Sequence, residues 1–149
     1  MRYLLDTNVL SEPLKAAANA QVLGLMRRFQ NDVVTAAPVW HELMFGCVRL
    51  VDSRKKRAIE TYLQEVVLPS MPILPYDERA ASWHADQRAR LARRGMTPAI
   101  VDGQIAAIAA VNGLVLVTRN VSDFQRFEEL QITDWQISSD IGASEQPTE

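Results

Sequence analysis

Cysteine and histidine are scarce in this chain, and neither is grouped as in a zinc or redox site. The 149 residues include one cysteine, Cys47, and two histidines, His41 and His84. A single cysteine excludes an internal disulfide and suits a reducing compartment. Neither histidine has a cysteine or histidine partner at zinc-site spacing. We therefore expect Cys47 to be a buried hydrophobic residue, and the histidines to be helix-surface or partly buried residues rather than ligands.

Long apolar runs and an excess of positive charge are also missing. No run approaches the roughly 18 apolar residues that cross a bilayer, and no apolar leader follows Met1-Arg2. We therefore expect no membrane span, no signal peptide and a cytoplasmic location. The net charge of −2 argues against a protein held to nucleic acid mainly by a basic surface. It does not exclude an enzyme whose carboxylates are neutralised by a metal ion.

Short apolar segments that alternate with helical patterns are the main feature that is present. Hydrophobic residues make up 48% of the chain, which is enough for the core of one domain. Strands are predicted at residues 2–5, 33–36, 71–75, 114–118 and 132–137. This alternation predicts an α/β fold with a mainly parallel central sheet of about five strands and right-handed crossovers. Two prolines in the segment 71–75 favour an edge position for that strand.

Helices are predicted between these strands. The apolar periodicity and the cap residues place them at residues 13–29, 38–50, 54–67, 77–94, 98–112 and 124–130. We expect a single domain over residues 1–137, because no internal repeat or second domain is visible. Residues 138–149 have the composition of a flexible C-terminal tail.

Four carboxylates are predicted to meet at one rim of the sheet. Asp6 directly follows the first strand, Glu42 lies in the first turns after the second, and Asp123 lies in the loop after the strand 114–118. Asp102 lies early in the helix that precedes that strand. Because the helix is antiparallel to the strand, its N-terminus lies at the strand's carboxyl edge, where α/β sheets form their sites. Asp77 also follows a strand, but it is interpreted as a helix cap.

The pair Asp102-Gly103 conflicts with its helical surroundings. Both residues are poor helix formers and together cost roughly 1.5 kcal/mol relative to alanine. Such conflicts between local preference and fold are expected at functional sites. The small side chains of Ala99, Ala106 and Ala109 would let the helix backbone approach a neighbouring element.

Four carboxylates in one cleft need a counter-charge, because like charges raise one another's pKa. Oxygen ligands favour Mg²⁺, or Mn²⁺, over zinc. We therefore predict Asp6, Glu42, Asp102 and Asp123 as metal ligands and as the catalytic acids of a phosphodiester hydrolase that acts on RNA. Taken singly, each acid also has a structural interpretation: Asp6 and Asp123 as helix caps, and Glu42 as an exposed helix residue.

The order and surroundings of these acids resemble a known family. The motifs that carry the resemblance are Asp6-Thr7-Asn8-Val9-Leu10-Ser11-Glu12, Glu42-Leu43 with Gly46, Pro98 with Asp102 and Ile105-Ala106-Ala107, and Thr118-Arg119-Asn120-x-x-Asp123-Phe124. Together they resemble the PIN domain, and most closely the VapC-type ribonuclease toxins of bacterial toxin–antitoxin pairs, including the FitB-like branch. The resemblance covers about residues 2–137.

The resemblance implies a three-layer α/β/α PIN fold and an Mg²⁺-dependent endoribonuclease. It also implies a homodimer that a VapB-type antitoxin silences. Asp6 and Asp102 would be the principal metal ligands, and Glu42 and Asp123 would complete the acidic cluster. Thr118 and Asn120 would be catalytic-site residues that support the metal, its water or the first acid.

Contacts to RNA require cations and often aromatic stacking. The candidate cations are Arg88, Arg90, Arg93, Arg94 and Arg119, although a solvated helix face explains the run 88–94 equally well. The tryptophans Trp40, Trp83 and Trp135 are either stacking platforms or core and interface residues.

Two other functions fit part of the pattern. A phosphatase of the haloacid-dehalogenase type also places an aspartate after its first strand, but it needs a second aspartate where this chain has Asn8, and no clear catalytic lysine is present. A non-catalytic module could use the acidic rim to bind a basic peptide. A ribonuclease assay that is sensitive to EDTA separates these alternatives.

Overall fold

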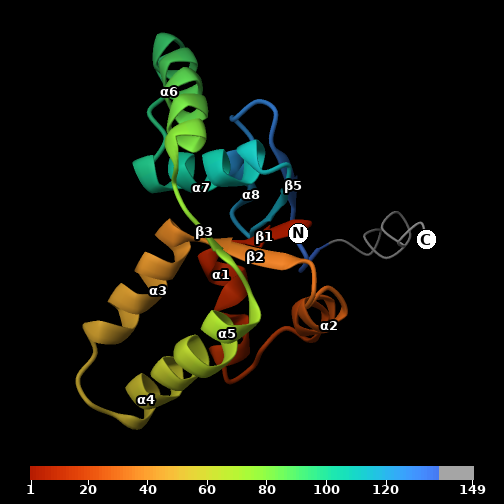
Figure 1. Ribbon diagram of the computed structural model, residues 1–149, viewed down its shortest axis with the longest axis vertical. Coiled ribbons are helices and arrows are strands. Elements are labelled where there is room, and N and C mark those ends of the chain that lie inside the picture. Colours follow the sequence, from red (N-terminus) through yellow and green to blue (C-terminus); the bar gives the residue numbers. More distant parts are fainter. Residues whose placement is uncertain (138–149) are drawn as a thin grey trace.

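A parallel sheet with the strand order β3-β2-β1-β4-β5 forms the centre of the protein (Figure 1). The computed structural model describes residues 1–137. The strands are β1 (Tyr3–Leu5), β2 (Val33–Ala36), β3 (Ile73–Leu74), β4 (Val115–Val117) and β5 (Gln131–Thr133). Tyr3 of β1 pairs with Val33 on one side and with Val115 on the other. The predicted parallel sheet of five strands is therefore confirmed.

Burial explains where each strand lies in the sheet. Every residue of β1 and β2 is buried, as expected for central strands that are covered on both faces. The residues of β3 are only half-buried, and Pro72 and Pro75 flank the strand. Proline lacks a backbone donor and is tolerated at a sheet edge, so the predicted edge position of this strand is confirmed.

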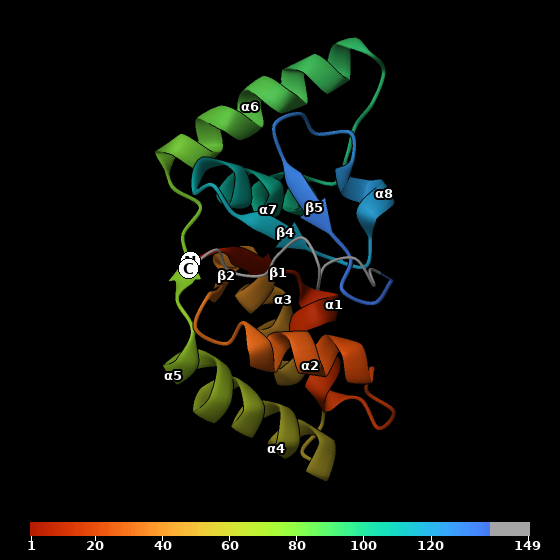
Figure 2. The same cartoon turned by 90° about the vertical axis from the view of Figure 1, so that its right-hand side faces the viewer.

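Helices cover both faces of the sheet. The helices are α1 (Thr7–Leu10), the 3₁₀ helix η1 (Glu12–Leu14), α2 (Ala20–Arg28), α3 (Ala37–Val48), α4 (Arg54–Thr61), the π-helical turn η2 (Tyr62–Val67), α5 (Leu68–Ser70), α6 (Glu78–Arg93), α7 (Ile100–Val111) and α8 (Val121–Phe124). Figures 1 and 2 show α1, α2 and α4 on one side of the sheet, and α6 and α7 on the other. The predicted three-layer α/β/α architecture is confirmed.

The strand order reverses between β1 and β4. From β1 the chain moves outward to β2 and β3, and it then returns past β1 to β4 and β5 on the other side. In such sheets the connections leave the two central strands toward opposite faces. Functional sites of such sheets form at the carboxyl ends of these strands. Asp6 and Thr118 each come directly after one of them.

The prediction of one continuous helix over residues 13–29 was wrong for the first half of that range. Asp6 caps the short helix α1, the 3₁₀ helix η1 follows, and α2 begins only after Asn19. The Asn19 side chain accepts a hydrogen bond from the Val22 N–H at 3.1 Å, which starts a new helix there. The predicted cap at Asp77 is confirmed, because its carboxylate accepts a hydrogen bond from the Ala80 N–H at 3.0 Å.

The elements predicted near the C-terminus are shorter than expected. Helix α8 ends at Phe124 instead of continuing to Leu130, and Glu129 has a φ of 59°, which no right-handed helix contains. Strand β5 ends at Thr133 instead of Ile137. Trp135 turns inward soon after the strand, where its ring lies 5.3 Å from Tyr3 and 6.0 Å from Phe29. The predicted tail, residues 138–149, lies outside the described residues.

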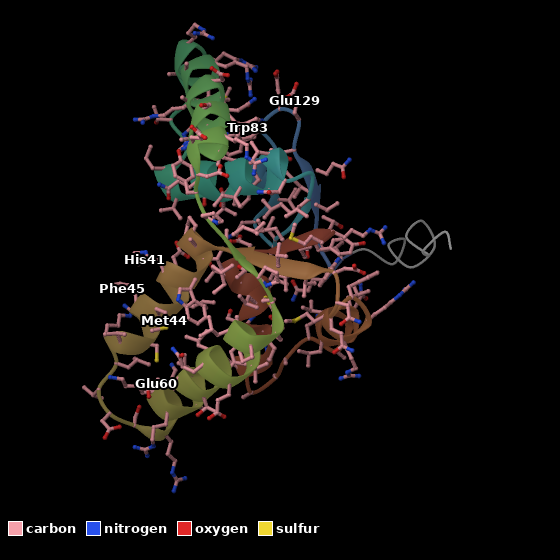
Figure 3. All side chains as sticks on the ribbon, in the orientation of Figure 1. His41, Met44, Phe45, Glu60, Trp83 and Glu129 are labelled. Atoms are coloured by element: carbon pink, nitrogen blue, oxygen red, sulfur yellow. The ribbon has the colours of Figure 1, made fainter. Side chains whose placement is uncertain are left out.

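All three tryptophans pack against the core. Trp135 is fully buried, and Trp40 and Trp83 are half-buried against the main hydrophobic cluster. Trp83 of α6 points toward the loop that carries Glu129, where its ring lies 6.0 Å from Phe127 (Figure 3). Core packing therefore accounts for the tryptophans. Cys47 is also buried, as expected, and within residues 1–137 no helix has the length and apolar character to cross a bilayer.

A close approach between α6 and α7 explains Gly103. The buried His84 ring of α6 lies directly against the Gly103 backbone, and a Cβ at this position would overlap the ring. The His84 Nδ1 is 2.9 Å from the Tyr76 hydroxyl, which limits its freedom to move aside. The local conflict seen at Asp102-Gly103 therefore has two causes. The glycine serves helix packing, which leaves Asp102 as the functional candidate.

We predict that Gly103→Ala destabilises the protein by about 1–3 kcal/mol, because the added methyl group overpacks the contact with His84. The matched control is Gly24→Ala in α2, where no atom lies within 4 Å of the added Cβ. That change should stabilise the fold by about 0.5–1 kcal/mol through helix propensity. Urea denaturation measures both. The cost of Gly103→Ala should shrink in a His84→Ala background, and an unchanged cost would contradict this explanation.

Candidate active site

Asp6 is buried between the ends of β1 and β4, and residues that follow each of these strands bind it. Its backbone N–H donates to the Val117 carbonyl at 2.9 Å, which ties the end of β1 to β4. Its Oδ1 accepts a hydrogen bond from the Thr7 N–H at 2.8 Å. Its Oδ2 accepts a hydrogen bond from the Thr118 hydroxyl at 2.7 Å. The carboxylate is only 6% exposed and is therefore fixed in position.

Thr118 is oriented by its own contacts. It is fully buried, and its N–H donates to the Thr133 carbonyl of β5 at 3.0 Å. Its hydroxyl accepts a hydrogen bond from the Asn120 N–H at 3.0 Å, which directs its proton toward Asp6. The Asn120 side chain makes no hydrogen bond within residues 1–137. Thr118 thus supports the first acid directly, whereas Asn120 acts through its backbone.

Glu42 is connected to Asp6 through Thr7. The Thr7 hydroxyl donates to Glu42 Oε2 at 2.9 Å, while the Thr7 N–H binds Asp6. Glu42 lies on α3, so this contact joins residues 35 positions apart in the sequence. Its side chain is exposed at the rim. One threonine therefore sets the spacing of the first two acids.

Asp102 and Asp123 lie in the first turns of α7 and α8, at the same rim of the sheet. Burial raises the pKa of Asp102 to about 6, and the charges of Asp123, Asp6 and Glu42 add to the effect. The pKa of Asp6 is also raised, mainly by burial, against the lowering effect of the bonds from Thr118 and Thr7. The charges of Asp6, Glu42 and Asp123 thus each act on the ionisation of Asp102, and those of Glu42 and Asp123 also act on Asp6. The structure brings all four within electrostatic reach at one rim.

Sequence reasoning missed three polar residues that hold the site together. These are Thr7, Asn8 and Thr35. Asn8 Oδ1 accepts a hydrogen bond from the Arg119 N–H at 3.3 Å, and the buried Thr35 hydroxyl donates to the Leu5 carbonyl at 2.9 Å. Thr7 and Asn8 stand directly after Asp6, which was a signal of their role. Thr35 gave no signal beyond a polar side chain in a buried strand.

The predicted cations differ in their contacts. Arg90 donates to the Arg126 carbonyl at 2.8 Å and lies 3.5 Å from Glu128, so it fixes the loop after α8. Arg88, Arg93 and Arg94 are exposed on α6 or at its end. Arg119 follows Thr118 directly, and it alone among the five adjoins a residue that binds Asp6.

Comparison with known proteins identifies the family. A family model described as PIN domain matches residues 3–130, which is most of the chain. The chain belongs to the PIN domain family. The family resemblance drawn from the motifs is thereby confirmed.

Individual relatives agree with the family assignment. Toxin FitB of Neisseria gonorrhoeae is 34% identical over 135 residues, which cover 89% of this chain and 97% of FitB. The crystal structure of FitAcB from that organism has a TM-score of 0.84 at 32% identity and covers 91% of this chain and 99% of its own. The tRNA(fMet)-specific endonuclease VapC of Salmonella typhimurium is 34% identical over 139 residues, 91% of this chain and 98% of VapC.

A further solved structure describes a related pair of proteins. VapBC-5 from Mycobacterium tuberculosis, described as a member of the VapBC family of toxin-antitoxin systems, has a TM-score of 0.67 at 28% identity. The match covers 89% of this chain and 98% of that chain. The fold of this PIN domain is therefore shared along nearly its whole described length.

The four acids of this PIN domain offer the type of ligand atom, carboxylate oxygen, that a hard divalent cation prefers. All four acids offer oxygen ligands, and the pKa values of Asp6 and Asp102 are raised by burial and by neighbouring carboxylates, two effects that a bound cation would oppose. Within residues 1–137, no three His, Cys, Asp or Glu side chains are yet arranged to enclose an ion. Closure around an ion at Asp6 would therefore require a rim side chain to turn. Asp123 is exposed, and Glu42 is exposed but would have to release its hydrogen bond from Thr7.

We predict that ionised Asp102 destabilises the metal-free PIN domain. Its folded pKa of about 6 lies above the ordinary value of 3.8, so the folded state binds the proton more tightly than the unfolded state. The free energy of unfolding of the metal-free protein therefore falls as the pH rises from about 4 to about 6. In EDTA near pH 7.5, Asp102→Asn should be more stable than wild type by about 1 kcal/mol, after allowance for solvent screening. Near pH 3.5 the difference should vanish.

Urea denaturation at the two pH values measures this effect, and Asp86→Asn on the exposed face of α6 is the matched control. Addition of Mg²⁺ at neutral pH should raise the unfolding free energy of the wild type more than that of Asp102→Asn, because only the wild type keeps the full ligand set. Equal stability of wild type and Asp102→Asn at both pH values would contradict the assignment.

Proposed function

We propose that this chain is a metal-dependent endoribonuclease, the toxin of a VapBC-type toxin–antitoxin pair. The observation that carries the proposal is the constellation around Asp6. A buried carboxylate is fixed by Thr118 and Thr7 at the strand reversal, and the charges of Asp6, Glu42 and Asp123 add to the effect of burial on the ionisation of Asp102. Four carboxylates of this kind suit the activation of water at a phosphodiester through a bound cation.

We propose Mg²⁺, or alternatively Mn²⁺, as the cofactor. Asp6 and Asp102 would hold it as principal ligands, with Glu42 and Asp123 completing the cluster. When bound, such a cation supplies Lewis-acid chemistry, because it offsets the negative charge that develops on a phosphodiester during hydrolysis. The pKa of Asp102 is raised by burial and further by the charges of the other three acids, and a cation at this position would oppose both effects.

The chain's own residues divide the remaining tasks. Asp6 is the fixed element, because two hydrogen bonds and burial prevent its rotation. Thr118 and the Asn120 backbone keep it oriented. Glu42 and Asp123 are more exposed, and one of these carboxylates can accept the proton of the attacking water. Thr7 links the fixed acid to Glu42 and so keeps this acceptor beside Asp6.

RNA is the proposed substrate, and a VapB-type antitoxin is the proposed partner. The name of the Salmonella relative, a tRNA(fMet)-specific endonuclease, supports RNA cleavage. The toxin name of FitB and the toxin-antitoxin description of VapBC-5 support a protein inhibitor. We also propose a homodimer. The exposed apolar side chains of Phe45 (Figure 3) and of Val48, both on α3, support a protein-binding surface.

The phosphatase alternative loses its support in the structure. The position of its second aspartate is taken by Asn8, whose side chain binds the Arg119 backbone instead of facing a substrate. Membership of the PIN domain family also places the first aspartate in a different fold. The non-catalytic alternative is decided by the following assay.

We predict that purified wild-type protein cleaves single-stranded RNA in Mg²⁺ and that EDTA abolishes the cleavage. Asp6→Asn and Asp102→Asn should each lower the rate at least about 100-fold, since each removes a ligand charge while keeping the side-chain shape. Asp86→Asn is the control and should keep full activity. The measurement is cleavage of a fluorophore-labelled oligonucleotide. Full activity of either site variant would refute the assignment, and an inactive wild type would favour a non-catalytic module.

A further inference from the structure

Glu12 is a buried charge that has no part in the acidic cluster. It lies in η1 and is only 2% exposed. Its Oε1 accepts a hydrogen bond from the Asn19 N–H at 2.8 Å. Its Oε2 lies 2.8 Å from Lys15 Nζ and 3.8 Å from Arg119 Nη1. One carboxylate therefore joins η1, the start of α2 and the loop after β4.

Arg119 is held at both of its ends. Its backbone N–H donates to Asn8 Oδ1 at 3.3 Å, and its side chain extends to Glu12. In the chain it stands between Thr118, which binds Asp6, and Asn120, which orients Thr118. The Arg119 backbone therefore lies at the rim that carries the acids, and its guanidinium is paired with Glu12, which follows α1 in the chain.

The guanidinium of Arg119 is anchored but not saturated. The 3.8 Å separation from Glu12 is an ion-pair distance that exceeds a hydrogen bond. Within residues 1–137 its side-chain N–H groups donate no hydrogen bond, and the side chain is 35% exposed. The Nε and Nη2 donors of its planar fork, which are not the ones nearest Glu12, thus remain free for a ligand. A residue with a purely structural role would use these donors on protein acceptors.

The charge balance favours an anionic ligand at this position. Glu12, Lys15 and Arg119 sum to −1 + 1 + 1 = +1, whereas the four acids of the rim carry −4 when ionised. An RNA phosphate that approaches the acids needs a nearby cation, and the guanidinium fork matches phosphate oxygens in two-point contacts. The Lys15 ammonium and the Asn19 N–H lower the pKa of Glu12, which keeps it ionised at neutral pH.

We propose that Arg119 binds a backbone phosphate of the RNA substrate beside the catalytic acids and that Glu12 is the positioning residue that holds its guanidinium there. This inference rests on the ribonuclease function proposed above, and it assigns a substrate-binding task to one of the five candidate arginines. Glu12 acts only through Arg119, and neither residue contributes a ligand to the acidic cluster.

The test is steady-state kinetics of the full-length protein on a labelled single-stranded RNA in Mg²⁺ at several salt concentrations. Arg119→Gln should raise KM about tenfold and change kcat less than threefold, because a contact to a neighbouring phosphate that does not itself react is made equally in the ground and transition states. The slope of log KM against log salt should fall by about 0.7, the value for one phosphate contact to a single strand. Arg119→Lys should restore part of the loss, since it keeps the charge without the fork.

Glu12→Gln keeps the side-chain shape and the acceptor for the Asn19 N–H but removes the anchoring charge. It should raise KM severalfold, with kcat nearly unchanged. In the Arg119→Gln background it should have no further effect on KM, since a positioning residue acts through the residue it positions. The matched control is Arg28→Gln at the end of α2, beyond the amino edge of the sheet, which should leave KM and the salt slope unchanged. Thermal unfolding confirms that each variant is folded.

The outcomes separate this inference from the function on which it rests. Cleavage by the wild type with an unchanged KM and salt slope in Arg119→Gln overturns the inference alone. Additive effects of Glu12→Gln and Arg119→Gln on KM overturn the role of Glu12, and Arg119→Gln remains informative if Glu12→Gln fails to fold. A wild type that cleaves no RNA overturns the proposed function, and with it the basis of this inference.

Discussion

The gathering of like charges at one point of the sheet is the constraint on which this structure depends. Asp6 is buried at the strand reversal, and burial is the largest of the effects that oppose its ionisation, followed by the charges of Glu42 and Asp123. The bonds from Thr118 and Thr7 partly offset this cost, and the hydroxyl of Thr7 then brings Glu42 to the same place. The fold thus loses stability by holding carboxylates near one another, which is typical of functional sites.

The topology explains why residues far apart in the sequence meet. Thr118 and Asp6 are 112 positions apart but follow neighbouring strands, β4 and β1, and the connections after these strands lead to helices on opposite faces of the sheet (Figure 2). Asp102 and Asp123 arrive from the first turns of α7 and α8, on the face opposite α1 and α2. A second set of contacts, from Asn8 and Glu12 to Arg119, ties the N-terminal helices to the same loop. The site is therefore a junction between both helical layers.

Much of this arrangement could be predicted from the sequence, and the rest required contacts in three dimensions. The apolar run before Asp6 predicted a buried strand, because buried strands consist of apolar residues. The prolines around β3 predicted an edge strand, because proline has no backbone N–H to donate within a sheet. The acids could be placed at one rim because parallel strands end together. The break at Asn19 and the turn at Glu129 were missed, since the helical pattern continues through both positions. Thr35 contacts Leu5, and Glu12 contacts Arg119. Because both partners are distant in the sequence, no local sequence pattern could predict these contacts.

The central claim is that the four acids share a cation, and a direct view of the ion tests it best. The measurement is an anomalous difference map from crystals of the protein grown with Mn²⁺. The account predicts a peak within coordination distance of a carboxylate oxygen of Asp6 and of at least one other acid of the rim. A fully occupied ion elsewhere on the protein, with no peak at Asp6, would contradict it.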